Sequence, residues 1–255
     1  DEGAAQRRYA DRPDVLARFV EEAQIGGQLQ HPGVVPVYEL GVLADQRPYF
    51  TMKLVKGETL AARLAQRAGA AAERRGLLDV FLAVCHTMAY AHSRRVIHRD
   101  LKPANIMVGS FGEVQVVDWG LAKVLPRGGV ADERPRPSAA SGPAASIIAT
   151  LRTEPGSAGA SVAGSVLGTP SYMPPEQARG SVDELDERSD VFALGAMLCE
   201  ILTGEPPYLE RDGDALRQAA RCELGPALAR LDACGADPAL IALCRRCLAG
   251  PRSER

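Results

Sequence analysis

Residues 98–105 read HRDLKPAN, and Asp118 opens a DWG triplet shortly afterwards. Asp100 and Asn105 place a carboxylate and an amide at the two ends of one tight loop. A carboxylate in such a loop can accept a hydroxyl proton, and an amide oxygen is a ligand for a hard cation such as Mg²⁺. Lys102 lies between them and can direct its ammonium group to a phosphate, while Asp118 supplies the carboxylate that Mg²⁺ prefers. The stretch therefore predicts phosphoryl-transfer chemistry.

HRDLKPAN followed by DWG resembles the catalytic and metal-binding loops of the bacterial eukaryotic-like (Hanks-type) serine/threonine protein kinases. Further motifs match this family in the same order, namely EEAQ, HPG, GTPSYMPPEQ, SDVFALG and the final Arg255. Lys102, two residues after Asp100, follows the Ser/Thr-specific pattern, and EEAQIGGQLQHPGVVPVYELG is similar to the bacterial branch. The resemblance implies an α+β, two-lobed protein-kinase-like fold with an incomplete small lobe and a mostly helical large lobe.

The resemblance also implies where the parts of that fold lie. Residues 1–52 would be the remainder of the small lobe, 53–57 the hinge and 58–255 the large lobe. The activation segment would run over 118–176 and contain an insert at about 127–168. Of those 42 insert residues, 26 are Ala, Gly, Pro or Ser, which predicts a long mobile loop because such a segment buries little apolar surface.

Hydrophobic periodicity predicts the regular elements around these motifs. A helix is expected over 12–30 with Asp14 as its N-cap, because apolar residues recur there at helical spacing. The turn residues SFGE predict a hairpin between two short strands. Gly204 is a natural C-terminal stop for the long apolar helix before it. Strands are expected at 34–43, 47–55, 106–108 and 114–117, and further helices at 59–66, 76–93, 189–204, 214–221 and 238–248.

The family's catalytic roles transfer to this sequence position by position. Asp100 would be the catalytic base and Lys102 the contact to the γ-phosphate. Asn105 and Asp118 would bind the metal. The resemblance thus assigns the four motif residues the same chemistry that their residue types indicate.

Nucleotide contacts follow from the same resemblance. Glu22 would be the helix carboxylate that pairs with the ATP-binding lysine, and Met52 would be the gatekeeper. The backbone of Lys53 and Val55 would contact adenine, with Met107 packing beneath it. The implied cofactors are ATP and Mg²⁺, with Mn²⁺ as an alternative metal.

Four residues outside the catalytic loop receive supporting roles. Asp190 would brace the catalytic loop from below, and Thr169 would touch Asp100 and help to hold the peptide acceptor. Glu176 would pair with Arg255. Because Pro251 is displaced by one position from the usual pattern, Arg252 competes with Arg255 for that pairing.

Arg99, directly before the catalytic Asp, suggests control by phosphorylation of the activation loop. Arg18 and Lys123 could join it in a basic pocket, since a phosphate would satisfy all three cations and order the segment. The candidate acceptors are Thr150, Thr153, Ser157, Ser161 and Ser165. An insert of this length could reach a second copy of the kinase, so self-association for trans-autophosphorylation is sterically plausible.

Several residues depart from the family pattern or carry simpler interpretations. Trp119 replaces the commoner Phe, and is expected to remain an apolar plug beside His98. Pro174 replaces Ala at little cost, because proline is tolerated in a first helical turn. Gly26 stands where a larger apolar residue is common, which is expected to loosen the helix that carries Glu22. His31 and His98 are expected to be structural, and the two remaining histidines, His86 and His92, receive no role.

The largest departure precedes Glu22, where the sequence contains neither GxGxxG nor a VAxK strand. Lys53 is the first lysine and lies in the expected hinge. We therefore expect the chain to be a piece of a kinase that starts after the lysine strand and is close to inactive by itself. The alternative is a pseudokinase or kinase-like binding module, against which the intact set of catalytic motif residues argues.

Other functional classes find less support in the sequence. Small-molecule phosphotransferases share the Asp and Asn elements but lack GTPxYMxPE. Cys244 and Cys247 form a CxxC that could bind zinc with Cys222 and Cys234, although buried reduced thiols are the better interpretation. A formal net charge of −2 gives no reason to expect nucleic acid as a partner.

The expected partners are proteins with Ser or Thr acceptors. No apolar run in this sequence is long enough to span a bilayer. The sequence therefore predicts a cytoplasmic protein and leaves open a membrane anchor elsewhere in a longer parent protein.

Overall fold

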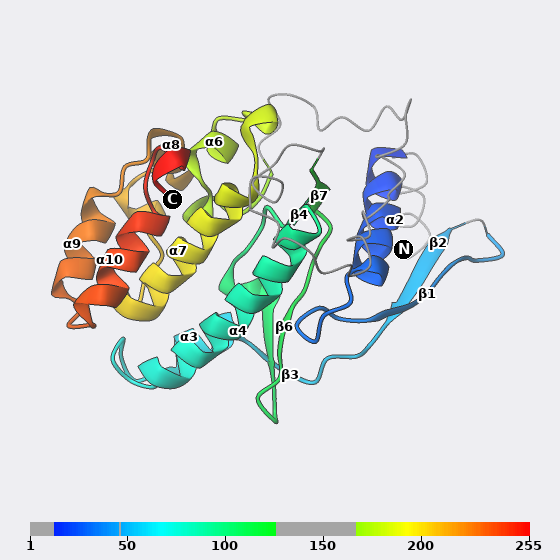
Figure 1. Ribbon diagram of the computed structural model, residues 1–255, viewed down its shortest axis with the longest axis horizontal. Coiled ribbons are helices and arrows are strands. Elements are labelled where there is room, and N and C mark those ends of the chain that lie inside the picture. Colours follow the sequence, from blue (N-terminus) through cyan, green and yellow to red (C-terminus); the bar gives the residue numbers. More distant parts are fainter. Residues whose placement is uncertain (1–12, 46, 126–166) are drawn as a thin grey trace, which may run out of the picture.

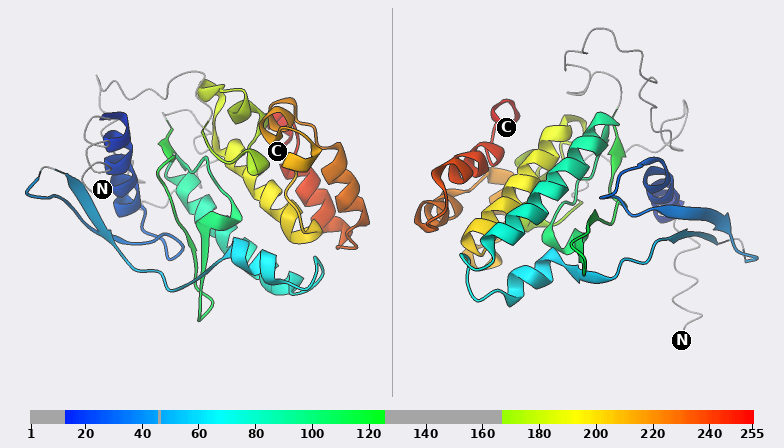
Figure 2. Two further views of the ribbon diagram at one scale, coloured as in Figure 1. Left: turned by 180° about the vertical axis from the view of Figure 1, so that it is seen from behind. Right: turned by 60° about the horizontal axis from the view of Figure 1, so that its bottom comes forward.

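The computed structural model of the chain describes residues 13–45, 47–125 and 167–255. Helix α2 (Pro13–Gln28) and the antiparallel pair β1 (Val37–Val42) and β2 (Pro48–Met52) lie together at one end of the molecule (Figure 1). Short strands and a group of helices make up the rest (Figure 2). The expected α+β class is confirmed.

The α2 end is held together by a small apolar contact surface. Ile25 of α2 and Leu29 in the turn after it are buried, and the rings of Phe19 and Phe50 lie with centroids 4.8 Å apart. The helix begins at Pro13, so the prediction that Asp14 is its N-cap was wrong.

Short antiparallel strands surround the motif loop. Strand β3 (Gly57–Thr59) pairs with β5 (Ile106–Gly109), which pairs with β6 (Val114–Val116), so the predicted hairpin is confirmed. Strands β4 (Val96–Ile97) and β7 (Lys123–Val124) form a second pair. A single parallel bridge between Val34 and Val116 ties the turn after α2 to β6.

The helical part is organised around α7 (Glu187–Thr203), which is buried along nearly its whole length. Gly204 ends it in the left-handed conformation at φ 94°, as the sequence predicts. Ala193, Leu194 and Met197 join one apolar cluster with α4, and Phe192 and Leu198 join a second cluster with the C-terminal helices. The other helices are α3 (Leu60–Gln66), α4 (Arg74–Ser93), α6 (Pro175–Ala178), α8 (Ala215–Arg221), α9 (Gly225–Ala233) and α10 (Pro238–Cys247).

Helix α9 is the longest described element that the sequence analysis missed, and the short strands β3, β4 and β7 were missed as well. Its sequence, GPALARLDA, starts with a Gly-Pro pair that is typical of turns, and only Ala227 and Leu231 are buried. A stripe of two apolar residues is too short for periodicity to show. The predicted insert at 127–168 falls almost entirely outside the described residues.

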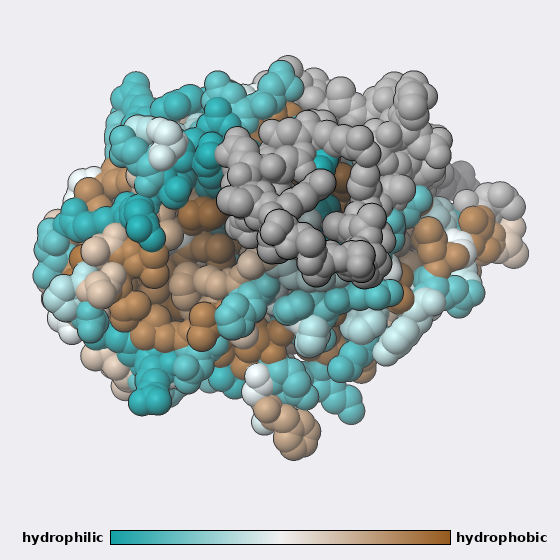
Figure 3. All heavy atoms as spheres, viewed as in Figure 1, coloured by the Kyte–Doolittle hydropathy of each residue, from teal (hydrophilic) through white to brown (hydrophobic). Residues whose placement is uncertain are grey.

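Apolar residues on the face of Figure 3 gather mainly over the helical part of the molecule, whereas polar residues dominate its upper edge. Helix α4 is the longest described helix at 20 residues and is amphipathic. No helix in the described ranges combines the length and apolar character needed to cross a membrane.

Candidate active site

The loop that carries Asp100 is fixed at both ends by the strands around it. Strand β4 leads into it, the Pro103–Asn105 turn follows, and β5 leaves it. Leu101 is buried and anchors the middle of the loop in the core. Arg99 adopts φ 68°, a left-handed conformation that non-glycine residues rarely take outside constrained functional segments.

Asp100, Lys102 and Thr169 form a closed triangle of contacts. The Lys102 ammonium group lies 2.7 Å from Asp100 Oδ2 and donates to Thr169 Oγ1 at 2.7 Å. The Thr169 hydroxyl in turn donates to Asp100 Oδ1 at 2.9 Å. Both carboxylate oxygens are therefore oriented, and the segment GTPSY is brought to the catalytic loop across 69 residues of sequence.

Asn105 is turned so that its amide oxygen remains available. Its Nδ2 donates to the backbone oxygen of Asp100 at 3.0 Å, and its own backbone oxygen accepts the Val117 N–H at 2.9 Å. Asp118 follows directly, is exposed, and adopts φ 62°. The loop and the segment that follows β6 are thus joined beside two oxygen-bearing side chains.

This donor set fits a hard divalent cation. Mg²⁺ takes oxygen ligands, and commonly one or two protein side chains together with phosphate oxygens and water. The Asn105 amide nitrogen is committed to Asp100, so the free amide oxygen and the Asp118 carboxylate are the groups that would hold the metal.

His98 couples the two motif segments from inside the core. Its Nδ1 accepts the Asp100 N–H at 3.3 Å, and its Nε2 donates to the Val117 carbonyl at 3.1 Å. Burial lowers the pKa of this fully buried histidine, so the ring stays neutral with one donor and one acceptor. Trp119 packs against it with ring centroids 4.7 Å apart, in the plug position that the sequence predicts.

Glu22 lies in an acidic environment. A Cβ built on Gly120 would be 3.1 Å from Glu22 Oε2 and 3.3 Å from Asp118 Oδ1, so both carboxylates converge on this glycine. Burial, and then the charge of Asp118, raise the pKa of Glu22 to about 7. A cation between or beside the two carboxylates would relieve this repulsion.

Asp190 holds the catalytic loop through its backbone. The carboxylate accepts the His98 N–H at 2.8 Å and the Arg99 N–H at 2.9 Å. A third contact comes from His92 of α4, whose Nε2 lies 2.8 Å from Asp190 Oδ2. Burial alone would raise the pKa of Asp190, but the hydrogen bond and charge of His92 and the contacts to His98 keep it below its usual value.

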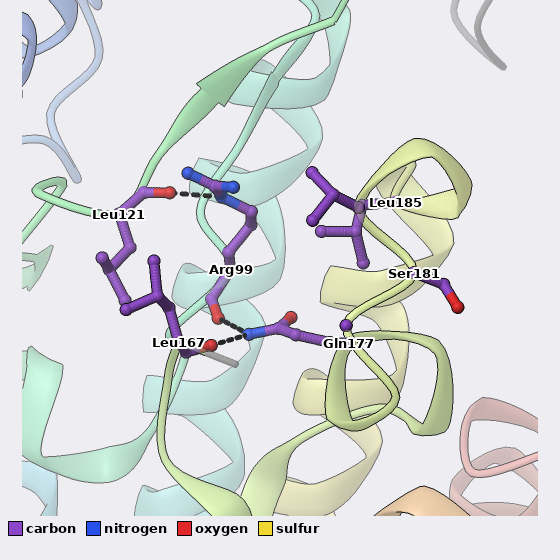
Figure 4. Close-up of a pocket in the computed structure, with 8 residues that line it drawn as sticks. Arg99, Leu121, Leu167, Gln177, Ser181 and Leu185 are labelled. Atoms are coloured by element: carbon purple, nitrogen blue, oxygen red, sulfur yellow. Dashed lines mark hydrogen bonds between the residues drawn. The ribbon is translucent and has the colours of Figure 1, made fainter. Parts of the chain in front are cut away.

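Gln177, like His92, positions the Asp100 loop and received no role in the sequence analysis. Its Nε2 donates to the carbonyls of Arg99 and Leu167, each at 2.7 Å, as the close-up in Figure 4 shows. This amide joins the catalytic loop to the start of the GTPSY segment. The signal was present in PPEQ, but a single glutamine after a helix start has no recognisable pattern of its own.

Glu176 and Arg255 form a buried bidentate ion pair, with Nη1–Oε1 and Nη2–Oε2 distances of 2.7 and 3.0 Å. The Arg255 guanidinium also lies 4.9 Å from the centre of the Phe192 ring. Arg252, the competing residue, instead contacts Asp186 at 3.3 Å and the Glu184 carbonyl. The geometry therefore favours the pairing with Arg255.

The expected hinge residues lie where β2 ends. The Lys53 N–H donates to the Pro36 carbonyl at 3.0 Å, and Met52 is 44% exposed. Among the described residues, the Val55 N–H has no backbone hydrogen-bond partner. Met107 lies on β5 opposite Thr59 and is half-buried.

Arg99 and Lys123 bring two positive charges together near the start of the predicted activation segment. The Arg99 side chain donates to the Leu121 carbonyl, and Lys123 Nζ donates to the Val182 carbonyl at 3.4 Å. Burial, and then the charge of Arg99, lower the pKa of Lys123. The Arg18 side chain and the five candidate acceptor hydroxyls lie outside the described residues.

The cysteines are all free thiols, and Cys199 and Cys244 are buried between α7 and α10. Cys244 Sγ donates to the Gly195 carbonyl at 3.4 Å. Within the described ranges, no three His, Cys, Asp or Glu side chains are grouped as a metal site would require.

Comparisons with known proteins agree with this geometry. Residues 5–255 match the family described as the protein kinase domain. The chain is 34% identical over 218 residues to serine/threonine-protein kinase PknD of Protochlamydia amoebophila, covering 82% of this chain and 21% of that relative. It is 35% identical over 199 residues to serine/threonine-protein kinase PknB of Mycobacterium tuberculosis, covering 77% of this chain and 27% of the relative. The chain thus spans about a fifth to a quarter of the length of these curated relatives.

Proposed function

The chain belongs to the protein kinase family, and we propose that the protein containing it transfers the γ-phosphate of ATP to serine and threonine hydroxyls of other proteins. The similarity to proteins named serine/threonine-protein kinases supports the acceptor class. The observation that carries the proposal is the triangle of Asp100, Lys102 and Thr169, with contacts of 2.7 to 2.9 Å. This triangle brings together a carboxylate base, an ammonium cation and a hydroxyl group at the position where an acceptor hydroxyl would bind.

Asp100 is the base in this proposal. An acceptor hydroxyl that replaces Thr169 or approaches beside it would donate to the carboxylate, which would orient the oxygen. The carboxylate would take the proton as the bond from this oxygen to the γ-phosphorus forms and the bond from the γ-phosphorus to the leaving oxygen of ADP breaks. Lys102 places positive charge next to the transferring group, where negative charge spreads over the phosphoryl oxygens. The 2.7 Å contact between Lys102 and Asp100 supports a shared site for both roles.

Asn105 and Asp118 are the residues that would hold Mg²⁺, with Mn²⁺ as the alternative. When bound, the metal and ATP supply the phosphoryl group and part of the charge neutralisation. The chain's own contribution is to fix the two oxygen ligands. The contacts Asn105 Nδ2 to Asp100 O and Val117 N to Asn105 O support this assignment.

Residues 53–57 would form the hinge between a small-lobe part (1–52) and a large-lobe part (58–255), and the nucleotide would lie along this hinge. In this arrangement the backbone of Lys53 and Val55 contacts adenine, Met52 lines the back of the site and Met107 its floor. Glu22 would accept a cationic partner, which its convergence with Asp118 on Gly120 supports.

Regulation by loop phosphorylation is part of the proposal, with Arg99 and Lys123 as phosphate contacts. Their proximity, which lowers the pKa of Lys123 after burial, supports a basic pocket. Trans-phosphorylation between two copies would deliver the phosphate. Because the reaction uses ATP, we place the domain in the cytoplasm.

The test is transfer of radiolabelled phosphate from ATP by the protein that contains this chain, with myelin basic protein as acceptor. We expect phosphoserine and phosphothreonine in the product. Asp100→Asn should lower the rate by about 10²- to 10⁴-fold, as loss of a general base does. Asp45→Asn, the same change at an exposed turn position, should retain the rate. Equal rates for wild type and Asp100→Asn would contradict the kinase proposal and favour a non-catalytic binding module.

A further inference from the structure

A pocket of about 550 Å³ lies between the turn after α2, the middle of α4 and the start of β6. Asp100, Asn105 and Asp118 are not among its lining residues. Its volume is in the range typical of small-molecule sites. Its walls come from four separate segments of the chain, and the polar groups that face it are His31, Lys53, His86 and Glu113, together with Thr87 and Gln115.

The backbone turn that forms one wall is fixed against α4. A Cβ built on Gly33 would lie 1.9 Å from Thr87 Oγ1, so the turn approaches the helix as closely as glycine allows. His31 Nδ1 accepts the Gly33 N–H at 3.0 Å, and the ring stacks on Tyr90 of α4 with centroids 5.2 Å apart. Because Nδ1 is an acceptor, the proton of neutral His31 is on Nε2, which is a donor.

His86 brings a second imidazole to the same pocket from α4, one helical turn before Tyr90. The two rings are near enough to interact electrostatically. Burial, and then His86, lower the pKa of His31. An anion bound between the two rings would oppose this effect, because a nearby negative charge favours the protonated form of each imidazole.

The remaining charged groups of the pocket are Lys53 and Glu113. Across the described ranges, neither the Lys53 ammonium group nor the His86 ring has a hydrogen-bonding side chain or carbonyl as partner. Glu113 Oε2 accepts the Phe111 N–H at 3.1 Å and lies against Gly109, so its charge is directed to its own hairpin. The pocket therefore offers more unused donors than acceptors.

We propose that this pocket binds a small anionic molecule through a phosphate or carboxylate group, held by His31, His86 and Lys53. The Nε2–H of His31 and the donors of His86 and Lys53 are groups that an anion would satisfy together. The pocket is larger than a single ion needs, so its ligand carries an organic part that packs on Ala83, Pro36 and Val114.

A ligand in this pocket would lie next to two segments that lead to candidate active-site residues, namely the turn after α2 and strand β6. The turn at Gly33 continues α2, which carries Glu22, and its carbonyl accepts the Val116 N–H at 2.8 Å. Val116 is two residues before Asp118. A ligand in the pocket would therefore contact the segments that set the relative position of these two carboxylates.

The chain has four histidines, so the ring ¹³Cε1–¹H resonances of the 255-residue chain report on the pocket directly. The probes are inorganic phosphate and acetate, each compared with sodium chloride at equal ionic strength. We expect saturable shifts of the His31 and His86 resonances with at least one probe, and a rise in the pKa of His31. A response to phosphate only, or to acetate only, identifies which anionic group the pocket prefers. His92 and His98, which lie inside the catalytic core, should not move.

His86→Ala is the decisive variant, because the residue is exposed and alanine suits a helix. It should weaken anion binding at His31 by at least tenfold. Arg75→Ala, which removes an exposed cation elsewhere on α4, should leave binding unchanged. Absence of a saturable shift with both anions, or equal shifts of all four histidines, would overturn the proposal.

Discussion

Asp190 and His92 meet in a 2.8 Å contact between carboxylate Oδ2 and imidazole Nε2, and the same carboxylate holds the backbone of residues 98 and 99. The pair joins three segments that are far apart in the sequence, namely α4, the catalytic loop and α7. Asp190 is 1% exposed, so each of its hydrogen bonds replaces one that water would make in the unfolded chain.

We predict that His92→Ala lowers the free energy of unfolding by about 2 kcal/mol, since it removes one hydrogen bond to a buried carboxylate. Urea denaturation of the chain measures this. His86→Ala, at an exposed position of the same helix, is the matched control and should stay within about 0.5 kcal/mol of wild type. His92→Gln retains a donor and should recover part of the loss. An equal effect of both alanine variants would contradict the assigned role.

The two C-terminal arginines should differ sharply. Arg255→Ala leaves Glu176 buried without its partner, and breaking a buried pair in this way costs about 3 to 5 kcal/mol. Arg252 is partly exposed, and its pairing with Asp186 should contribute about 1 kcal/mol or less. Thermal and urea unfolding of the two variants distinguish the cases. Similar losses of unfolding free energy in the two variants would show that the buried Glu176–Arg255 pair stabilises the chain no more than the Arg252–Asp186 pair.

Two glycines provide a test of backbone packing. Gly27, in the last turn of α2, has open space where the methyl group of an alanine would lie, so Gly27→Ala should stabilise the chain by about 0.5 to 1 kcal/mol. Gly33→Ala drives Cβ into Thr87 Oγ1 and should cost about 1 to 3 kcal/mol. Adding Thr87→Ala should restore part of that loss. A neutral Gly33→Ala would contradict the close approach of turn and helix.

Loop phosphorylation gives an activity prediction. Phosphatase treatment of the protein that contains this chain should lower its kinase rate, because in the proposed scheme a phosphate would order the activation segment through Arg99 and Lys123. Arg99→Gln should remove this sensitivity. Arg99→Lys keeps the charge without the planar fork and should retain part of it. An unchanged rate after verified dephosphorylation would reject the regulatory scheme.

The sequence indicated those candidate residues of the site that are written as contiguous motifs. Asp100, Lys102 and Asn105 come from one loop, and Asp118 lies just after strand β6, so residue type and spacing indicated their chemistry. Glu176 and Arg255 were harder, because Arg252 had similar spacing. The choice depends on which guanidinium is buried beside Phe192, and that is a property of packing.

His92 and Gln177 could not be found in this way. Each acts through a hydrogen bond to a residue more than 70 positions away, and neither belongs to a pattern of several functional residues. The raised pKa of Glu22 likewise comes from burial and from Asp118, which only the folded chain brings close. The sequence therefore could not predict which single side chains the fold brings together from distant parts of the chain.

Helix α7 has consequences for the dynamics of the catalytic loop. Consecutive residues of α7 enter different apolar clusters, with Phe192 in one and Ala193 in the other. Opening this helix would disrupt both clusters, so its central amides should exchange with solvent deuterium only through global unfolding. The His98 and Arg99 amides are bonded to Asp190 of the same helix. The loop that would carry out the chemistry should therefore share the slow hydrogen exchange of the deepest part of the core.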